Sequence, residues 1–262
     1  MSYQYKNLVC DLQNNIMLVT INRPDVLNAL NSVVFSELKD VFQKLLDSSD
    51  VKVVILTGSG NKSFIAGSDV SEMSKLSLLQ ARKFALLANQ AQQTLANFPK
   101  PTIAAINGYA FGGGLEVAMC CDIRIASQNA KFGQPEINLG IIPGGGGTQR
   151  LSRLIGLGRA KQMVFSGLTI DAQRAYEIGL VNQVVSPDLL LAEALKLAEV
   201  ISAKSPVTLA FAKQALDTGF DMDLENSLKL ELELFAECFG TEDAKEGLSS
   251  FVDKRKPSFT GK

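Results

Sequence analysis

Two glutamates beside glycine-rich turns are the side chains of this chain best suited to acid–base chemistry. Glu116 follows a strand-like segment and three consecutive glycines at 112–114. Glycine lets a ligand approach the backbone closely, and the first amides of a helix can stabilise an anion because they lack partners within the helix. Glu136 is the one charged residue between Phe132 and Gln149, so we expect partial burial to raise its pKa and suit it to general acid catalysis. Taken singly, each also fits an ordinary surface glutamate.

A loop of small residues, 63–69, follows the apolar run at 51–57 and is a third candidate segment. Open α/β proteins bind ligands at the carboxyl ends of their sheet strands, so the amides of this loop could face the glycine turn. Thioester chemistry needs such donors at a carbonyl oxygen that gains enolate character. Addition of water to a neighbouring double bond also needs one acid and one base, which two glutamates can provide. By itself, the loop fits equally well a plain strand-to-helix connection with Asp69 near the helix start.

Histidine is absent from the 262 residues, which excludes Ser-His-Asp triads, His-assisted cysteine nucleophiles and His-bearing zinc sites. Paired carboxyl groups also serve glycosidases, but the chain has no tryptophan and only four tyrosines that could stack on a sugar. The glycine runs match neither the dinucleotide-binding pattern nor the P-loop. We therefore expect carboxyl groups and backbone amides to do the chemistry, with no metal and no redox cofactor.

The bulk composition is that of a soluble globular protein. The formal net charge is −1 and the pI is about 5.7, so the basic excess typical of nucleic-acid binding is missing. No apolar run approaches the roughly 20 residues of a membrane-spanning helix, and the first residues lack the pattern of a secretory signal. The four cysteines form no CxxC motif, as expected of reduced thiols. We expect a cytoplasmic protein that binds neither nucleic acid nor membrane.

The elements that must position these residues alternate in type along the first 190 residues. Apolar, β-branched runs predict strands at 16–21, 51–57, 102–106, 123–126 and 181–185. Helical spacing of apolar residues predicts helices at 32–48, 78–97 and 115–121. The alternation favours a largely parallel sheet built from βα units. Further helices are predicted at 159–165, 171–178, 188–203, 206–216, 223–239 and 243–254. We divide the chain into an α/β core at 1–190 and a helical segment at 191–262, whose apolar faces suggest a homo-oligomer.

Long ordered motifs make the sequence similar to the crotonase (enoyl-CoA hydratase/isomerase) superfamily. They run from INRPDVLNALNS at 21–32, through KSFIAGSDVSEM, PTIAAINGYAFGGGLEVAMCCDIRIAS and FGQPEINLGIIPGGGGTQRLSRLIG, to FGTEDAKEGLSSFVDKRKPSF. Within the superfamily, the chain most resembles the short-chain hydratases, or 3-hydroxybutyryl-CoA dehydratases. The resemblance implies an α/β fold, the crotonase (ClpP-like) spiral of ββα units, with a helical C-terminal trimerisation region. It also implies a trimer or a dimer of trimers.

The resemblance assigns roles to the residues found above. The backbone amides of Ser68 and Gly113 would form an oxyanion hole for the thioester oxygen. Glu116 and Glu136 would hold one water for reversible syn addition to a 2-enoyl-CoA, giving a 3-hydroxyacyl-CoA. We assign delivery of the C2 proton to Glu136, and orientation and deprotonation of the water to Glu116. The acyl-CoA thioester is the substrate, so coenzyme A is not a separate cofactor.

The resemblance also implies contacts to coenzyme A and to the rest of the substrate. The residues expected to make them are Val26, Leu27, Ala66, Gly67, Asp69, Val70, Gly112, Pro135, Phe251 and Lys254. By position, Phe251 and Lys254 resemble residues that reach the adenosine end from a neighbouring subunit. Two departures remove positive charge, because Asp25 and Ser71 stand where relatives often carry lysine. Either the C-terminal lysines and arginines contribute more to phosphate binding, or coenzyme A binds more weakly.

The sequence is compatible with three functions. Possession of both glutamates favours a hydratase over an enoyl-CoA isomerase or an acyl-CoA hydrolase of the same superfamily. A non-catalytic, RNA-binding oligomer is opposed by the acidic pI and the absence of a Lys/Arg cluster. Acyl-chain length and the direction of the reaction in the cell stay open. Five residues are candidates for the acyl pocket and equally good core residues, namely Met73, Leu76, Leu86, Leu87 and Ile142.

Overall fold

The computed structural model describes residues 3–262 and contains two sheets in its α/β body. The larger sheet has six strands in the order β1 (Leu8–Gln13), β2 (Ile16–Ile21), β3 (Val53–Gly58), β5 (Thr102–Ile106), β7 (Ile123–Ser127) and β10 (Gln183–Val185). The smaller sheet has four short strands in the order β4 (Ser63–Ile65), β6 (Tyr109–Phe111), β8 (Lys131–Gly133) and β9 (Ile170–Asp171). Only the pairs β1–β2 and β8–β9 are antiparallel, which agrees with the expected, largely parallel arrangement.

A repeated ββα unit builds the body. A strand of the large sheet leads into a short strand of the small sheet and then into a helix, as in β3, β4 and α2 (Val70–Met73), or β5, β6 and α4 (Gly113–Cys120). The short strand β4 pairs in parallel with β6, and β6 pairs in parallel with β8. The loops that follow successive strands are therefore stacked at one edge. This arrangement confirms the expected spiral.

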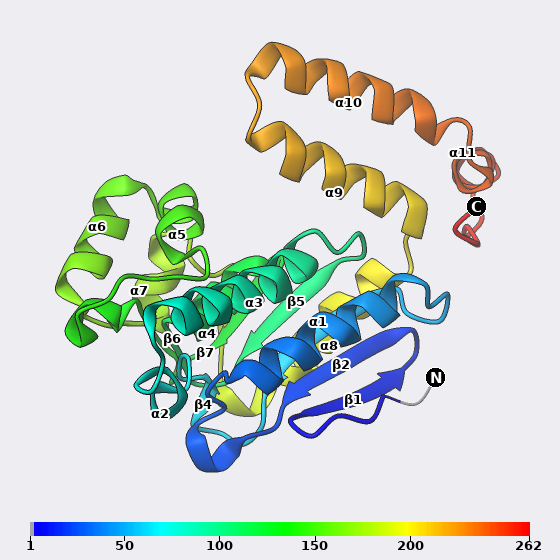
Figure 1. Cartoon of the computed structure of the whole chain (residues 1–262). Coiled ribbons are helices and arrows are strands. Elements are labelled where there is room, and N and C mark those ends of the chain that lie inside the picture. The colour runs from blue at the N-terminus through cyan, green and yellow to red at the C-terminus, as the bar shows by residue number, and fades with distance from the viewer. Residues whose placement is uncertain (1–2) are drawn as a thin grey trace.

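Helices cover both faces of the large sheet (Figure 1). On one face, α1 (Ser32–Leu46) packs beside α3 (Leu78–Ala96). The apolar face of α1 is fully buried in the main core, where Phe42 meets Phe98 edge to face. On the other face, α8 (Leu190–Ser202) buries Leu190, Ala194 and Ala198 against β3, β5 and β7. Small side chains on α8 permit this close approach to the sheet.

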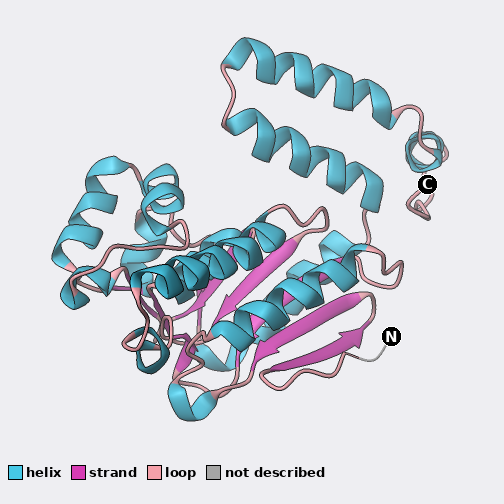
Figure 2. Ribbon diagram, viewed as in Figure 1, coloured by secondary structure: helices cyan, strands magenta, loops and turns pink. Residues whose placement is uncertain are grey.

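Three C-terminal helices project from the body as an arm (Figures 1 and 2). They are α9 (Pro206–Phe220), α10 (Leu224–Cys238) and α11 (Glu242–Val252). Large apolar side chains of the arm are exposed, at Leu216, Phe220, Leu224, Leu228, Leu232, Phe235, Phe239, Leu248, Phe251 and Val252. Helix α8 packs on the large sheet, and the projecting arm begins at α9. The division of the chain into a core at 1–190 and a helical segment at 191–262 stays a prediction. Among the described residues, no helix is long and apolar enough to span a membrane.

The predicted strands and long helices are confirmed within a few residues, but several short elements were missed. β4, β6 and β8 have three residues each and lie in segments that were interpreted as loops and turns. Such strands are specified by their neighbours in the second sheet and carry almost no periodic signal of their own. Helix α4 begins at Gly113, two residues before the predicted start, because the low helix propensity of glycine hides that start. Helix α5 (Gly147–Ile155) was not predicted, and it begins at the last residue of the four-glycine run at 144–147. The remaining helices, α6 (Leu157–Ser166) and α7 (Ala172–Glu177), lie near their predicted positions.

Candidate active site

The three-glycine turn joins β6 to α4 in a conformation that requires glycine. Gly112 has φ 48° and ψ −121°, and its N–H donates to the Gly133 carbonyl of the adjacent strand at 2.9 Å. A Cβ on Gly114 would overlap the carbonyl oxygen of Ile65. The turn therefore packs directly on β4, and α4 starts with Gly113 as its first residue. At that position the N–H of Gly113 has no partner within the helix.

The loop at 66–69 is held by pairing with residues 27–30. Ala66 N–H donates to the Leu27 carbonyl, Leu30 N–H to the Gly67 carbonyl, and Asp69 N–H to the Leu30 carbonyl, at 2.8–3.1 Å. The amide of Ser68 is left out of this pattern. Among the described residues, neither the Ser68 N–H nor the Gly113 N–H donates a hydrogen bond. Ser68 N lies 3.5 Å from the point where a Cβ on Gly113 would stand, so these two amides are neighbours.

Buried polar side chains hold these two loops in place. Arg23 forms an ion pair with Asp69 at 3.1 Å, and both side chains are largely buried. Asn28, fully buried, donates to the carbonyls of Ser59 and Ser63 at 3.0 and 2.9 Å. Val26 and Leu27 are instead exposed beside the loop.

Glu116 lies on α4, and only 4% of it is exposed. Its Oε1 accepts hydrogen bonds from the amides of Gly145 and Gly147, both at 2.8 Å. Burial raises the pKa of Glu116, and these two amides act against the rise because they stabilise the charged form. The four-glycine run thus serves as a cradle for this carboxylate. A Cβ on Gly145 would stand 2.5 Å from Oε2 of Glu116, which leaves no room for a larger residue.

Glu136 lies in the 3₁₀ turn η2 (Pro135–Leu139) and is half-buried. Burial, assisted by the negative charge of Glu116, raises the pKa of Glu136 to about 7. Its Oε1 lies 2.8 Å from the point where a Cβ on Gly112 would stand, so the carboxyl group lies over the glycine turn. The fully buried amide of Gln134, with its nitrogen turned toward Glu136, donates to both carboxylate oxygens at 2.9 and 3.0 Å.

The fold thus brings together most of the residues expected from the sequence. Glu136 borders Gly112, Gly113 borders Ser68, and Glu116 lies one turn further along α4. Ala66, Gly67, Asp69 and Val70 belong to the adjoining loop and the start of α2. Phe251 and Lys254 are not brought to this site, because α11 lies at the far end of the arm (Figure 1). Of the acyl-pocket candidates, Leu87 packs against the core, whereas Leu86 and Ile142 are exposed.

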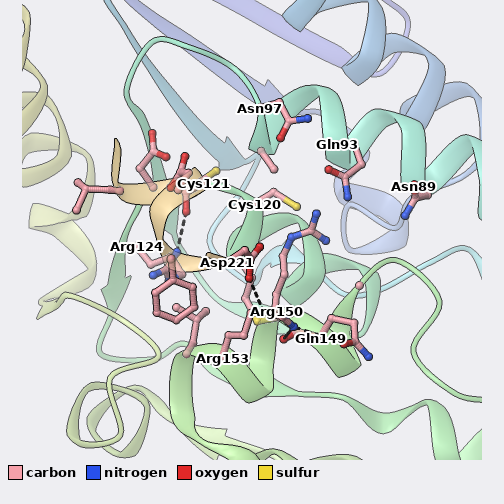
Figure 3. Close-up of a pocket in the computed structure, with 18 residues that line it drawn as sticks. Asn89, Gln93, Asn97, Cys120, Cys121, Arg124, Gln149, Arg150, Arg153 and Asp221 are labelled. Atoms are coloured by element: carbon pink, nitrogen blue, oxygen red, sulfur yellow. Dashed lines mark hydrogen bonds and ion pairs between the residues drawn. The ribbon is translucent and has the colours of Figure 1, made fainter. Parts of the chain in front are cut away.

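A cavity of about 770 Å³ lies elsewhere, between α3, α4, α5 and α9 (Figure 3). None of Glu116, Glu136 and Ser68 lines it. Arg153 of its wall pairs with Asp221 at 3.2 Å, and so ties α5 to the arm. Arg150, which also lines the cavity, donates to the Gly145 carbonyl at 3.0 Å. The cavity therefore adjoins the loop that cradles Glu116.

Sequence reasoning gave no role to several residues that touch the two carboxyl groups. In the sequence, Gln134, Gly145 and Gly147 belong to the stretch 132–149, in which only Glu136 is charged, and nothing there marks them individually. Gln92 carried a usable signal, because it shares the apolar face of α3 with Ala88, Ala91 and Leu95. A polar residue on such a face is either partnered or functional.

The family model described as enoyl-CoA hydratase/isomerase matches residues 11–262. The chain belongs to the enoyl-CoA hydratase/isomerase family. It is 49% identical over 253 residues to the short-chain-enoyl-CoA hydratase of Clostridium acetobutylicum, covering 97% of both chains. It is 45% identical to the crotonyl-CoA hydratase of Syntrophomonas wolfei, covering 98% of this chain and 99% of that one.

Solved structures agree with this assignment. The enoyl-CoA hydratase from Bacillus anthracis is 38% identical and superposes with a TM-score of 0.95 over 98% of this chain and 100% of that one. The family match at residues 11–262 includes the C-terminal arm.

Proposed function

We propose that the chain is an enoyl-CoA hydratase, which catalyses reversible syn addition of water to a 2-enoyl-CoA and yields a 3-hydroxyacyl-CoA. The observation that carries the proposal is the placement of two glutamates and two free backbone amides around one glycine turn. The names of the most similar relatives support the same activity. Isomerase and hydrolase activities are less well supported, because neither needs both carboxyl groups at once.

The two amides serve the thioester. In the proposed mechanism, Ser68 N–H and Gly113 N–H donate to the thioester oxygen as it gains enolate charge. Donors fixed in place before the reaction stabilise such a transition state without reorganisation, and each is worth on the order of 3 kcal/mol. A backbone amide is suited to this role because the fold, through the pairing of 66–69 with 27–30, fixes its direction.

The two glutamates divide the proton transfers. Ionised Glu116 takes a proton from the water while the water oxygen forms a bond to C3. The π electrons of the double bond move toward C2 and the thioester oxygen, and protonated Glu136 delivers its proton to C2. The pKa of Glu136, about 7, keeps much of this group protonated near neutral pH, whereas two amide donors favour the anion of Glu116. Burial raises the pKa of both groups, and the two amide donors that act against this rise at Glu116 make Glu116 the better candidate for the base.

The same observations bear on assembly and location. The exposed apolar residues on α9, α10 and α11 support a homo-oligomer, which we propose to be a trimer or a dimer of trimers. A neighbouring copy could then bring Phe251 and Lys254 to the coenzyme A end of the substrate. All four cysteines are free, as in a protein of the reducing cytoplasm. Since carboxyl groups and amides serve every step of the addition, we propose that no metal or redox cofactor takes part.

Product analysis with crotonyl-CoA tests the proposed activity. A hydratase converts it to 3-hydroxybutyryl-CoA, with loss of the absorbance of the conjugated thioester and without release of a free thiol. A parallel reaction with a 3-enoyl-CoA reports isomerase activity, and free coenzyme A reports hydrolase activity. If the folded wild type turns over none of several 2-enoyl-CoAs, the hydratase proposal is wrong.

A further inference from the structure

Gln92 carries a fully buried side-chain amide. It lies on α3, and only 1% of it is exposed. Neither its Nε2 nor its Oε1 has a hydrogen-bond partner among the described residues. Its neighbours on the same helix face are Ala88, Ala91 and Leu95, which are apolar. A buried amide with both polar atoms unpaired destabilises the fold, so its presence calls for a functional reason.

The amide of Gln92 lies against the cradle of Glu116. A Cβ built on Gly145 would stand 2.5 Å from Nε2 and 2.6 Å from Oε1 of Gln92, and 2.5 Å from Oε2 of Glu116. All three atoms therefore surround one point beside Gly145. Because Nε2 of Gln92 and Oε2 of Glu116 each lie 2.5 Å from that point, they are at most twice 2.5 Å apart. On Glu116, Oε1 already accepts the amides of Gly145 and Gly147, whereas Oε2 accepts no hydrogen bond from the described residues.

We propose that Gln92 is a positioning residue for Glu116, and that its Nε2 donates to Oε2 of the carboxylate during catalysis. Rotation about the last torsion of a glutamine side chain is broad and soft, so a small turn of the amide completes this bond. Glu116 would then be held by three donors, on α3 and on the four-glycine run, while it takes the proton of the attacking water. The inference rests on the proposed hydratase function and adds a residue to its base.

The electrostatics agree with this role. Gln92 lies close enough to the carboxylate to lower the pKa of Glu116 against the effect of burial. The other charged or titratable groups that act on Glu116 or respond to its charge are Arg150 on α5, Glu136 on η2 and Cys120 on α4. Of these, Arg150 lowers the pKa of Glu116. Loss of the Gln92 donor should therefore favour the protonated, inactive form of Glu116.

The test compares Gln92→Met with Gln93→Met in the full-length enzyme. Methionine keeps the volume of glutamine and removes its polar atoms. We expect Gln92→Met to lower kcat for crotonyl-CoA by about tenfold, the contribution of a hydrogen bond to a charged group, with KM changed less than about twofold. The acid limb of the kcat/KM profile should move to higher pH. The melting temperature should stay the same or rise, because an unpaired buried amide is removed. Gln93 is exposed and lines the cavity of Figure 3, so its variant should match the wild type.

Gln92→Glu is the second variant. A carboxylate beside Glu116 should move the acid limb further in the same direction than methionine does, because the two like charges repel. Wild-type kcat and an unmoved acid limb in Gln92→Met would overturn the inference, and so would lower kcat accompanied only by a lower melting temperature. Failure of the wild type to hydrate any 2-enoyl-CoA would instead overturn the proposed function, so the two failures are distinguishable.

Discussion

Gly145→Ala should disable the enzyme without unfolding it. The added Cβ would stand 2.5 Å from Oε2 of Glu116 and 2.5–2.6 Å from the amide atoms of Gln92. Relief to van der Waals separation requires these groups to retreat by about 1 Å. A misplacement of that size costs on the order of 10² in rate, or about 2.7 kcal/mol of transition-state stabilisation. We therefore expect kcat for crotonyl-CoA hydration to fall about a hundredfold.

Gly144 offers a matched control one residue earlier. A Cβ on Gly144 meets no atom within 4 Å, and neither glycine has positive φ, so alanine fits both backbones. Gly144→Ala should keep kcat within about twofold of the wild type, since no group near the carboxylate moves. Initial rates over a range of crotonyl-CoA concentrations give kcat and KM, and circular dichroism checks folding. Equal kcat values for a folded Gly145→Ala and the wild type would refute the cradle as the support of Glu116.

Three further predictions concern stability and assembly. Glu136→Gln should raise the free energy of unfolding by about 1–2 kcal/mol at pH 8.5 and leave it unchanged at pH 4. This figure is smaller than the full pKa shift would give, because solvent screens the charge of a half-buried group. The sign follows because the folded pKa of about 7 exceeds the unfolded one of about 4.3, so stability is lost as pH rises through about 7; denaturant melts at both values check it. Gly114→Ala should destabilise by more than about 3 kcal/mol through overlap with the Ile65 carbonyl, whereas Gly158→Ala, in open space on α6, should be neutral or stabilising in thermal melts. Leu232→Glu on the exposed face of α10 should dissociate the oligomer in analytical ultracentrifugation, and an unchanged sedimentation coefficient would contradict an interface there.

The parts of the fold that the sequence predicted are those with a strong local period. Helix α1 has one continuous buried face, and β2 and β5 are short β-branched or small apolar runs, so each was found within two residues. β4, β6 and β8 were missed because three residues among glycines show no period, and only their pairing in the second sheet makes them strands. Contacts between distant segments decide these elements.

In the candidate site, too, features set by the local sequence were predicted, whereas features set by contacts between distant segments were not. The lack of other charges around Glu136 predicted its burial and its raised pKa, and the structure agrees. The local sequence around Glu116 fits a surface residue equally well, because its hydrogen-bond partners, the amides of Gly145 and Gly147, lie 29 and 31 residues further along the chain. The pairing of Ser68 with Gly113 as donors came from the family resemblance. Gln92 could have been found, since it is a polar residue at a buried helical position.

The central claim is that Glu116 and Glu136 act together to add water to a 2-enoyl-CoA. The most direct test follows the loss of the crotonyl-CoA absorbance with the wild type, Glu116→Gln and Glu136→Gln, and identifies the product. We predict rapid formation of 3-hydroxybutyryl-CoA by the wild type and a loss of roughly 10²- to 10⁴-fold in each folded variant. Wild-type rates in either variant, or a product other than the 3-hydroxyacyl-CoA, would contradict the claim.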